Sequence, residues 1–388
     1  MKQTLSIASY LAVKEVWRNR GRFLLVSLVI ALITLLVLFI AALGEGLGNG
    51  NREYISKLDA ELLVYQGKSD TLIAASRLGR DRLAAVRRVE GVADAGMLGT
   101  SSATLVGGEK ELKVALLGVE PGHTGEPRVT DGRQLSTDLA QEALIDANTA
   151  YRTNLKVGDT LSLRVTQGTQ DEVFELRIVG ITAGNQYSLQ PSIFAPFFTW
   201  DRIRPKSEAE VGRSNPIANV LLVKLEDPAQ ADAVSQRITA QVDAVDVATR
   251  EAAIQALPGY SAQQSTLNTQ GAFTLFIGVL VIGGFFQIQI LQKVAQIGVL
   301  KAIGTANPAV GAAAVIQIVV ITIIGVAIGG VLTFLFSLSF PPTVPIVFNG
   351  TKSALALAAL LLIGPLGGLV SIRYAVRIEP LKALGLSS

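Results

Sequence analysis

In this 388-residue chain, the residues that could do chemistry do not occur at the spacings of the common catalytic motifs. The chain has no cysteine, which excludes thiolate nucleophiles, disulfides and Cys-ligated metals, and its one histidine is His123. No G-x-x-x-x-G-K-[ST] loop is present to hold nucleotide phosphates, and neither H-E-x-x-H nor G-x-S-x-G occurs. The sequence therefore predicts a protein that is not an enzyme and has no nucleotide site, cofactor, catalytic residue or bound metal of its own.

Two ionisable side chains are candidate ligand contacts. Glu45 lies about half a turn beyond an uncharged run of 21 residues, where its carboxylate could meet a metal or a cationic group. The alternative is a glutamate that is only solvated. His123 lies in the segment Glu120-Pro-Gly-His-Thr-Gly, where an imidazole could bind a metal, or could belong to a solvated polar loop.

The elements that must position these residues include four apolar spans. Mean hydropathy is +0.44 and only 17% of residues are charged, against about a quarter in a soluble domain. Each uncharged stretch is long enough to cross a hydrocarbon core of about 30 Å as a helix. The predicted spans are residues 23–43, 271–290, 309–338 and 353–372.

The distribution of lysine and arginine predicts the orientation of these spans. Basic residues gather before the first span, between the second and third, and after the fourth, and they favour the cytoplasmic side. We therefore expect a multi-pass protein of the cell (plasma or inner) membrane with both termini in the cytoplasm. Residues 1–22 are predicted to form a cytoplasmic amphipathic helix, and residues 373–388 a cytoplasmic tail. The net charge of +3 does not indicate a nucleic-acid partner.

Residues 44–270 are predicted to form a large extracytoplasmic α+β domain between the first two spans, so the fold class is membrane α-helical with one inserted domain. Two flanking segments, 44–59 and 255–270, are predicted to extend the spans as a helical stalk. A β-rich subdomain is expected near 125–182. The predicted strands are 61–66, 112–119, 160–165, 173–181 and 219–225, and the predicted helices are 77–89 and 228–242.

The spans themselves contain no ionisable residue, which argues against coupling to a proton or sodium gradient. Two pairs of glycines at four-residue spacing, Gly325 with Gly329 and Gly364 with Gly368, allow close helix contact. That contact lies either within the chain or in a dimer. Three glutamines at the inner end of the second span, residues 287, 289 and 292, are predicted to make structural hydrogen bonds.

The segment from Lys293 to Gly304, KVAQIGVLKAIG, lies between the second and third spans. It resembles the cytoplasmic coupling segment of the FtsX/MacB-like (type VII) ABC transporter permeases, whose pattern is R-x-x-E-I-[GA]-[IV]-L-[RK]-A-[LI]-G. Gln296 stands where that family has an acidic residue. The resemblance implies a coupling helix, 291–308, that docks in a groove of a cytoplasmic ABC ATPase. The implied coupling residues are Lys293, Gln296, Ile297, Leu300, Lys301, Ile303 and Gly304, with Ile297, Leu300 and Ile303 as the docked apolar face.

The order of one span, a large MacB-like core domain and three further spans is similar to this family over nearly the whole chain. Other stretches, among them Tyr187-Ser188-x-x-Pro191 and Leu257-Pro258-Gly259-Tyr260, resemble the haem-exporter permeases (HrtB-like) in particular. This resemblance implies an amphiphilic substrate, for example haem, with Glu45 and Tyr187 as candidate contacts. His123 and the tyrosines Tyr54, Tyr65 and Tyr260 are candidate haem ligands in principle, with packing or solvation as the alternative.

The family resemblance implies a permease subunit that forms a homodimer in membrane lipid and expels its substrate by mechanotransmission, using ATP hydrolysis in a separate subunit. Two alternatives stay open. One is an FtsX-like signalling subunit that controls an extracytoplasmic partner without transport. The other is a sensor unconnected to any ATPase.

Overall fold

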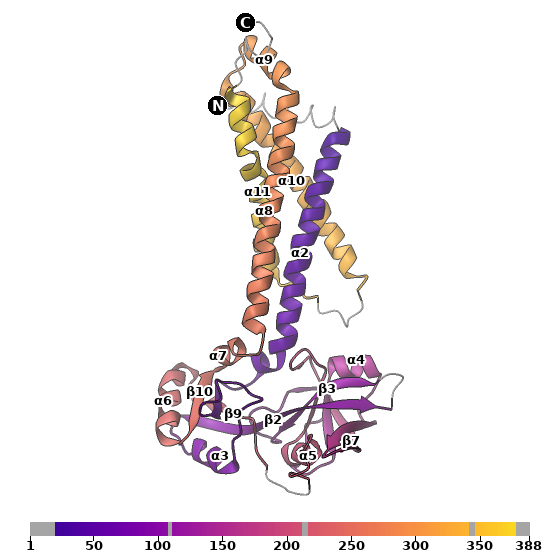
Figure 1. The fold of residues 1–388 in the computed structure, drawn as a ribbon, viewed down its shortest axis with the longest axis vertical. Helices are drawn as coiled ribbons and strands as arrows, with labels where there is room; N and C mark the ends of the chain where they lie inside the picture. Colours follow the sequence, from indigo (N-terminus) through magenta and orange to yellow (C-terminus); the bar gives the residue numbers. More distant parts are fainter. Residues whose placement is uncertain (1–19, 108–110, 212–215, 341–345, 378–388) are drawn as a thin grey trace. The chain divides into compact units, whose positions relative to one another are not determined.

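The computed structural model describes residues 20–107, 111–211, 216–340 and 346–377. It divides into two compact units (Figure 1). The helical unit comprises residues 1–46 and 264–388, and the sheet unit comprises residues 47–263. The predicted amphipathic helix of residues 1–22 and the tail of residues 373–388 lie largely outside the described residues.

The helical unit contains four helices long and apolar enough to cross a membrane, as predicted. A shorter helix connects the second to the third. Their apolar contacts form one cluster that includes Phe23, Ile30, Ile282, Ile321 and Leu360. The helices are α2 (Arg20–Lys57), α8 (Tyr260–Gln292), α9 (Val294–Ala302), α10 (Asn307–Ser337) and α11 (Gly350–Arg377).

The two helices that enter the sheet unit differ from each other in continuity. Helix α2 stays helical past Gly44, where the Leu267 side chain of α8 packs closely, and on to Lys57. Helix α8 begins at Tyr260, because Pro258 and Gly259, the latter with a φ of +76°, separate it from α7 (Arg250–Gln255). The prediction of continuous helix from residue 255 is therefore wrong at residues 256–259.

The spaced glycines make close helix contacts inside the chain. A Cβ atom at Gly325 would lie 2.6 Å from Ile30 of α2, and one at Gly329 would lie 2.5 Å from Cβ of Thr34. The second pair, Gly364 and Gly368 of α11, faces Thr322 and Ile318 of α10 in the same way. Both pairs thus serve packing within one protomer, which resolves the alternatives left by their spacing.

The sheet unit is built on one sheet of ten strands, in the order β10-β1-β9-β2-β3-β8-β5-β7-β4, with β6 pairing with β2 and β7. Two pairs, β3 with β8 and β5 with β7, are parallel, and the other pairs are antiparallel. The strands are β1 (Leu62–Gln66), β2 (Val92–Val106), β3 (Leu112–Val119), β4 (Val129–Gly132), β5 (Glu142–Asp146), β6 (Thr160–Gln167), β7 (Gln170–Thr182), β8 (Ser192–Pro196), β9 (Val220–Leu225) and β10 (Val245–Thr249).

Both faces of this sheet are covered. Along β1, Leu62 and Val64 belong to one apolar cluster and Leu63 and Tyr65 to the other, as the period of two in a strand requires. The first cluster includes side chains of α3, α5 and α6, and the second includes the end of α2 and α7. The bounds of these helices are α3 (Arg80–Val86), α4 (Ala147–Thr153), α5 (Phe197–Ile203) and α6 (Ala231–Gln241).

The predicted fold class is confirmed: four membrane helices with an α+β domain between the first and second. The five predicted strands are present as β1, β3, β6, β7 and β9. The β-rich subdomain expected near 125–182 is not separate, because its strands belong to the same sheet as the rest. The long strand β2 was not predicted; its Gly99 pairs with Gly118 of β3, and the two together leave room for the Trp200 indole.

Candidate functional site

The predicted coupling segment forms α9, and glycine ends it. Gly304 has a φ of +97°, its N–H donates to the Lys301 carbonyl, and the Thr305 N–H donates to the Leu300 carbonyl at 3.0 Å. This pair of bonds is the Schellman motif, which needs a left-handed residue after the helix. A glycine at position 304 therefore has a structural reason that does not depend on the ATPase.

One face of α9 packs on the transmembrane helices. Ile297 of α9 and Val310 of α10 both pack against Ile290 of α8. Ile297 and Leu300 also line a cavity of about 110 Å³ between α8, α9 and α10. Ile297 and Leu300, which are predicted with Ile303 to form the docked apolar face, are partly buried beside apolar side chains of α8 and α10, and their contact with an ATPase stays a prediction. Buried Gln289 lines the same cavity.

The opposite face of α9 is exposed. Ile303 is 75% exposed and Val299 is 47% exposed, while Gln296 lies beside them on the same face. Only Ile303 of the three predicted apolar contacts lies here. Val299 was missed, although its spacing of three residues from Gln296 and four from Ile303 places it on this face. We define the exposed face of α9 as residues 295, 296, 299, 302 and 303.

The two lysines of the segment hold α9 to neighbouring helices. The Lys301 ammonium donates to the Val376 carbonyl at 2.7 Å, near the C-terminal end of α11, where helical carbonyls lack partners. Partial burial lowers the pKa of this ammonium. Lys293 lies 5.7 Å from the centre of the Phe23 ring of α2. Through these contacts α9 is connected to α2 and α11 as well as to α8 and α10.

Glu45 is buried and paired rather than solvated. Only 6% of the residue is exposed, its carboxylate forms an ion pair with Lys352 of α11, and Asn349 Nδ2 donates to Oε1 at 3.3 Å. The Val347 N–H also donates to the Ala42 carbonyl at 3.1 Å. These contacts fix the segment before α11 to α2, so Glu45 has a structural role within the helical unit.

Tyr187 lines a cavity of about 360 Å³ within the sheet unit. Ser188, Leu257 and Pro258 line the same cavity, so the two stretches that resemble the haem-exporter permeases meet there. Burial raises the pKa of Tyr187 to about 12, although a hydrogen bond with Thr100 acts in the opposite direction. At neutral pH the side chain is a phenol that can donate a hydrogen bond, not a phenolate.

The backbone beside this cavity is strained. Ser188 and Leu189 have φ values of +53° and +62°, and Thr71, which also lines the cavity, has a φ of +57°. Left-handed conformations cost non-glycine residues about 1 kcal/mol each. The turn is held by the Leu189 N–H, which donates to the Gly50 carbonyl at 3.0 Å.

The two predicted substrate contacts are not brought together. Glu45 belongs to the helical unit and Tyr187 to the sheet unit, so they are separate candidate contacts.

Three of the four remaining predicted ligands are occupied, whereas the buried Tyr65 hydroxyl has no hydrogen-bond partner among the described residues. His123 Nδ1 lies 2.9 Å from an Asp94 oxygen, the Tyr54 hydroxyl donates to the Gly125 carbonyl, and the Tyr260 hydroxyl accepts from Arg52. Burial raises the pKa of Tyr65 above its ordinary value. Within the ranges that the structure describes, no three His, Asp or Glu side chains gather as a metal site.

Comparison with known families matches both parts of the chain. The MacB-like periplasmic core domain matches residues 23–241, and the FtsX-like permease C-terminal domain matches residues 269–380.

Individual relatives extend over nearly the whole chain. A protein assigned as the hemin transport system permease HrtB of Staphylococcus haemolyticus is 25% identical over 97% of this chain and 99% of its own length. An uncharacterized ABC transporter permease of Mycobacterium tuberculosis is 26% identical over the same shares. Among solved structures, the extracellular domain of the noncanonical ABC-type transporter YknZ covers 48% of this chain and 98% of its own, with 14% identity and a TM-score of 0.36.

Proposed function

The chain belongs to the ABC transporter permeases that combine a MacB-like periplasmic core domain with an FtsX-like C-terminal domain, and from this premise we propose that it is the membrane subunit of an exporter. A separate cytoplasmic ATPase would supply the energy. The observation that carries this proposal is the two-sided character of α9, which exposes one face and anchors the other.

The anchored face of α9 supports transmission of force. Ile297 and Leu300 pack on α8 and α10, Lys301 bonds to the end of α11, and Lys293 contacts the start of α2. A load applied to the exposed face would therefore reach all four spans through direct contacts. Helices α2 and α8 continue without a break into residues of the sheet unit, which makes them the route for movement toward that domain.

The substrate we propose is a hydrophobic or amphiphilic molecule, with haem as the leading candidate. Support comes from the relatives named as hemin permeases and from the absence of ionisable residues in the predicted spans. Tyr187 is the candidate contact in the sheet unit because its phenol lines a cavity of uncharged side chains. Glu45 is a candidate contact only if substrate displaces Lys352 from it.

The proposal is tested by purifying the chain together with a cytoplasmic ABC ATPase of the same organism and measuring ATP hydrolysis in lipid nanodiscs. We expect Val299→Asp to lower recovery of the complex at least about tenfold, because an interface tolerates a desolvated, unpaired charge poorly. The matched control is Val347→Asp, since Val347 is similarly exposed, at 40%, but lies before α11. Leu300→Asp is not a clean test, because Leu300 packs inside the bundle.

The same preparation tests the substrate. Haemin is expected to stimulate ATP hydrolysis by the wild-type complex. A complex that forms but ignores haemin would retain the permease assignment and remove haem. If Val299→Asp and Val347→Asp behave alike, α9 is not the docking element. An ATPase-bound chain that moves no substrate but activates an extracytoplasmic partner would instead support the FtsX-like signalling role.

A further inference from the structure

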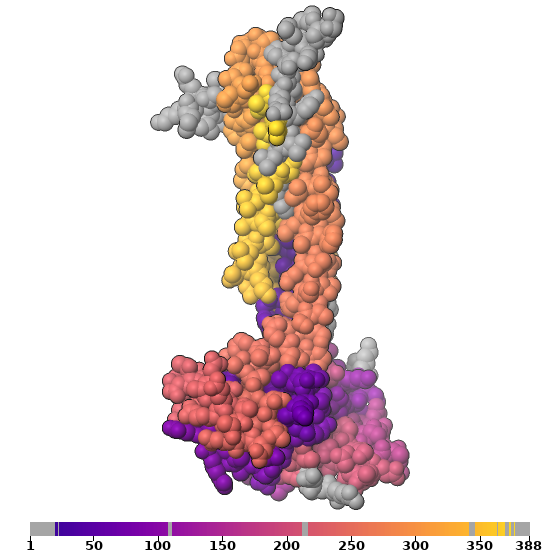
Figure 2. Space-filling view, turned by 60° about the vertical axis from the view of Figure 1, so that its left-hand side comes forward, coloured from indigo at the N-terminus to yellow at the C-terminus, as the bar shows by residue number. Residues whose placement is uncertain are grey.

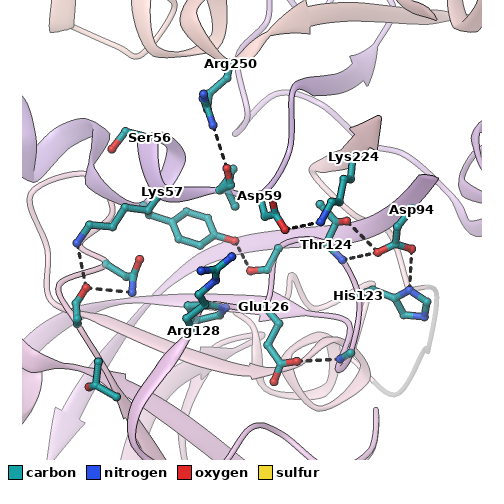
Figure 3. A pocket seen from close by; sticks show the side chains of 18 residues that line it. Ser56, Lys57, Asp59, Asp94, His123, Thr124, Glu126, Arg128, Lys224 and Arg250 are labelled. Carbon is teal, nitrogen blue, oxygen red and sulfur yellow. Dashed lines mark hydrogen bonds and ion pairs between the residues drawn. The ribbon is translucent and has the colours of Figure 1, made fainter. Parts of the chain in front are cut away.

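A second cavity in the sheet unit has no assigned role. It encloses about 710 Å³ and is lined by the end of α2, the loop of residues 122–128 and side chains of β2, β4 and β9 (Figure 3). This volume is within the range of small-molecule sites, about 300–1,000 Å³. We call it the outer cavity. It is distinct from the cavity beside Tyr187, with which it shares no lining residue.

The loop that forms one wall of the outer cavity is rigidly held. The Tyr54 hydroxyl donates to the Gly125 carbonyl at 2.9 Å, and the Thr124 N–H and hydroxyl both donate to Asp94 at 2.7 and 2.8 Å. Gly125, with a φ of +111°, lies against Leu222. Such anchoring fixes the position of the residues that follow the loop before any ligand arrives, which lowers the entropic cost of binding.

Each carboxylate of the outer cavity already has partners. Asp94 accepts from Thr124 and contacts His123, and Asp59 forms an ion pair with Lys224 at 2.6 Å. Glu126 accepts from the N–H groups of Gly122 and Leu135 at 2.8 and 2.9 Å. These acids therefore serve the structure of the wall, and Lys224 balances the charge of Asp59.

One cationic side chain of the cavity is not balanced in the same way. Arg128 is exposed in the cavity and makes no hydrogen bond or ion pair with any residue that the structure describes. Figure 3 shows its guanidinium in the middle of the labelled side chains, with Lys57 on one side and Lys224 on the other. Asp59 raises the pKa of Lys224, whereas the charge of Arg128 acts to lower it, so the two cations are close enough to repel each other.

Arg128 is therefore a cation of this cavity with no anionic partner among the described residues, and Lys224, which is paired with Asp59, lies beside it. A guanidinium offers a planar fork of donors that matches carboxylate and phosphate oxygens. We propose that the outer cavity binds an organic anion, with a carboxylate or phosphate group of that anion on Arg128 and with Lys224 beside it. This site is independent of the proposed export function, since it needs neither the ATPase nor an amphiphilic substrate.

The test is isothermal titration of citrate and of pyrophosphate into the full-length chain, without ATPase, in nanodiscs of zwitterionic lipid at low salt. We expect at least one probe to bind, and Arg128→Ala to weaken it about tenfold or more. Arg128→Lys should fall between, because it keeps the charge and loses the fork. The matched control, Arg88→Ala, removes an exposed arginine that does not line the cavity and should bind like wild type.

A second variant changes affinity in the opposite direction. Asp59→Asn releases Lys224 from its ion pair and should tighten binding of the same probe. Absence of binding by both probes, or equal losses in Arg128→Ala and Arg88→Ala, would overturn the site, and so would an unchanged affinity in Asp59→Asn. Repeating the titration in nanodiscs of phosphatidylglycerol separates a lipid phosphate from a soluble anion. If the lipid headgroup occupies the site, the wild-type chain should bind the probe more weakly in these nanodiscs, and Arg128→Ala should show no such difference between the two lipids. If the ligand is a soluble anion, the wild-type chain should bind the probe equally in both lipids.

Discussion

At the scale of single residues, Glu45 shows how far a sequence position can mislead about environment. Its place just beyond an apolar run predicts a carboxylate at the membrane interface. Its burial depends on Asn349 and Lys352, which lie more than 300 positions away. No local sequence pattern indicates that Glu45 pairs with residues so far along the chain. The sequence alone therefore could not decide whether Glu45 is solvated or paired.

We predict that Glu45→Gln destabilises the helical unit by about 1–3 kcal/mol, because a buried hydrogen-bonded charge pair loses its anion. The measurement is denaturant-induced unfolding of the full chain in detergent micelles. Glu251→Gln is the control, since Glu251 is exposed and its contact with Arg250 is 3.8 Å long, so its stability should change by less than about 0.5 kcal/mol. Equal losses in the two variants would show that Glu45 contributes no more than a surface pair.

At the scale of elements, sequence predicted the segments better than their partners. The four spans were predicted from uncharged runs and flanking basic residues, and the segment that forms α9 was predicted from the family resemblance. The docked face of α9 stays a prediction, and the partial burial of Ile297 and Leu300 could be found only by knowing which side chains α8 and α10 present to them. Strand β2 was missed for a related reason. Gly99 weakens the strand pattern, and the sequence does not show that the Trp200 indole packs against this glycine in the folded protein.

The glycine contacts between α2 and α10 give a sharp prediction. Gly329→Ile should destabilise the helical unit by at least about 1–3 kcal/mol, because its Cβ would lie 2.6 Å from the Ala31 carbonyl oxygen. Gly330→Ile is a control one position along the same helix, where a Cβ meets nothing within 4 Å. The measurement is the free energy of unfolding of both variants in detergent micelles. An unchanged free energy of unfolding in Gly329→Ile would contradict the packing of α10 on α2.

At the scale of the whole molecule, composition and span order predicted the class of protein correctly, and the family comparison agrees over nearly all of the chain. The orientation of the spans rests on the lysine and arginine bias and can be measured directly. Because the chain has no cysteine, each introduced cysteine is the only thiol present.

We predict that Arg88→Cys, in the sheet unit, reacts with a membrane-impermeant maleimide in intact cells. Ala302→Cys, on the exposed face of α9, should react only after the membrane is permeabilised. Both side chains are exposed, so accessibility within the protein does not separate them. Labelling of Ala302→Cys in intact cells would contradict the proposed topology, because α9 would then lie outside the cell, where a cytoplasmic ATPase cannot reach it.

The glycine pairs also bear on how two copies could meet in the bilayer. The glycine faces pack against other helices of the same protomer. The exposed side of α2 instead carries leucines such as Leu25, Leu28 and Leu32. Lipid tails solvate such a surface as well as another leucine face does. Any contact between copies through this side is therefore an exchange of lipid for protein, with an equilibrium that depends on acyl-chain composition and on the protein-to-lipid ratio.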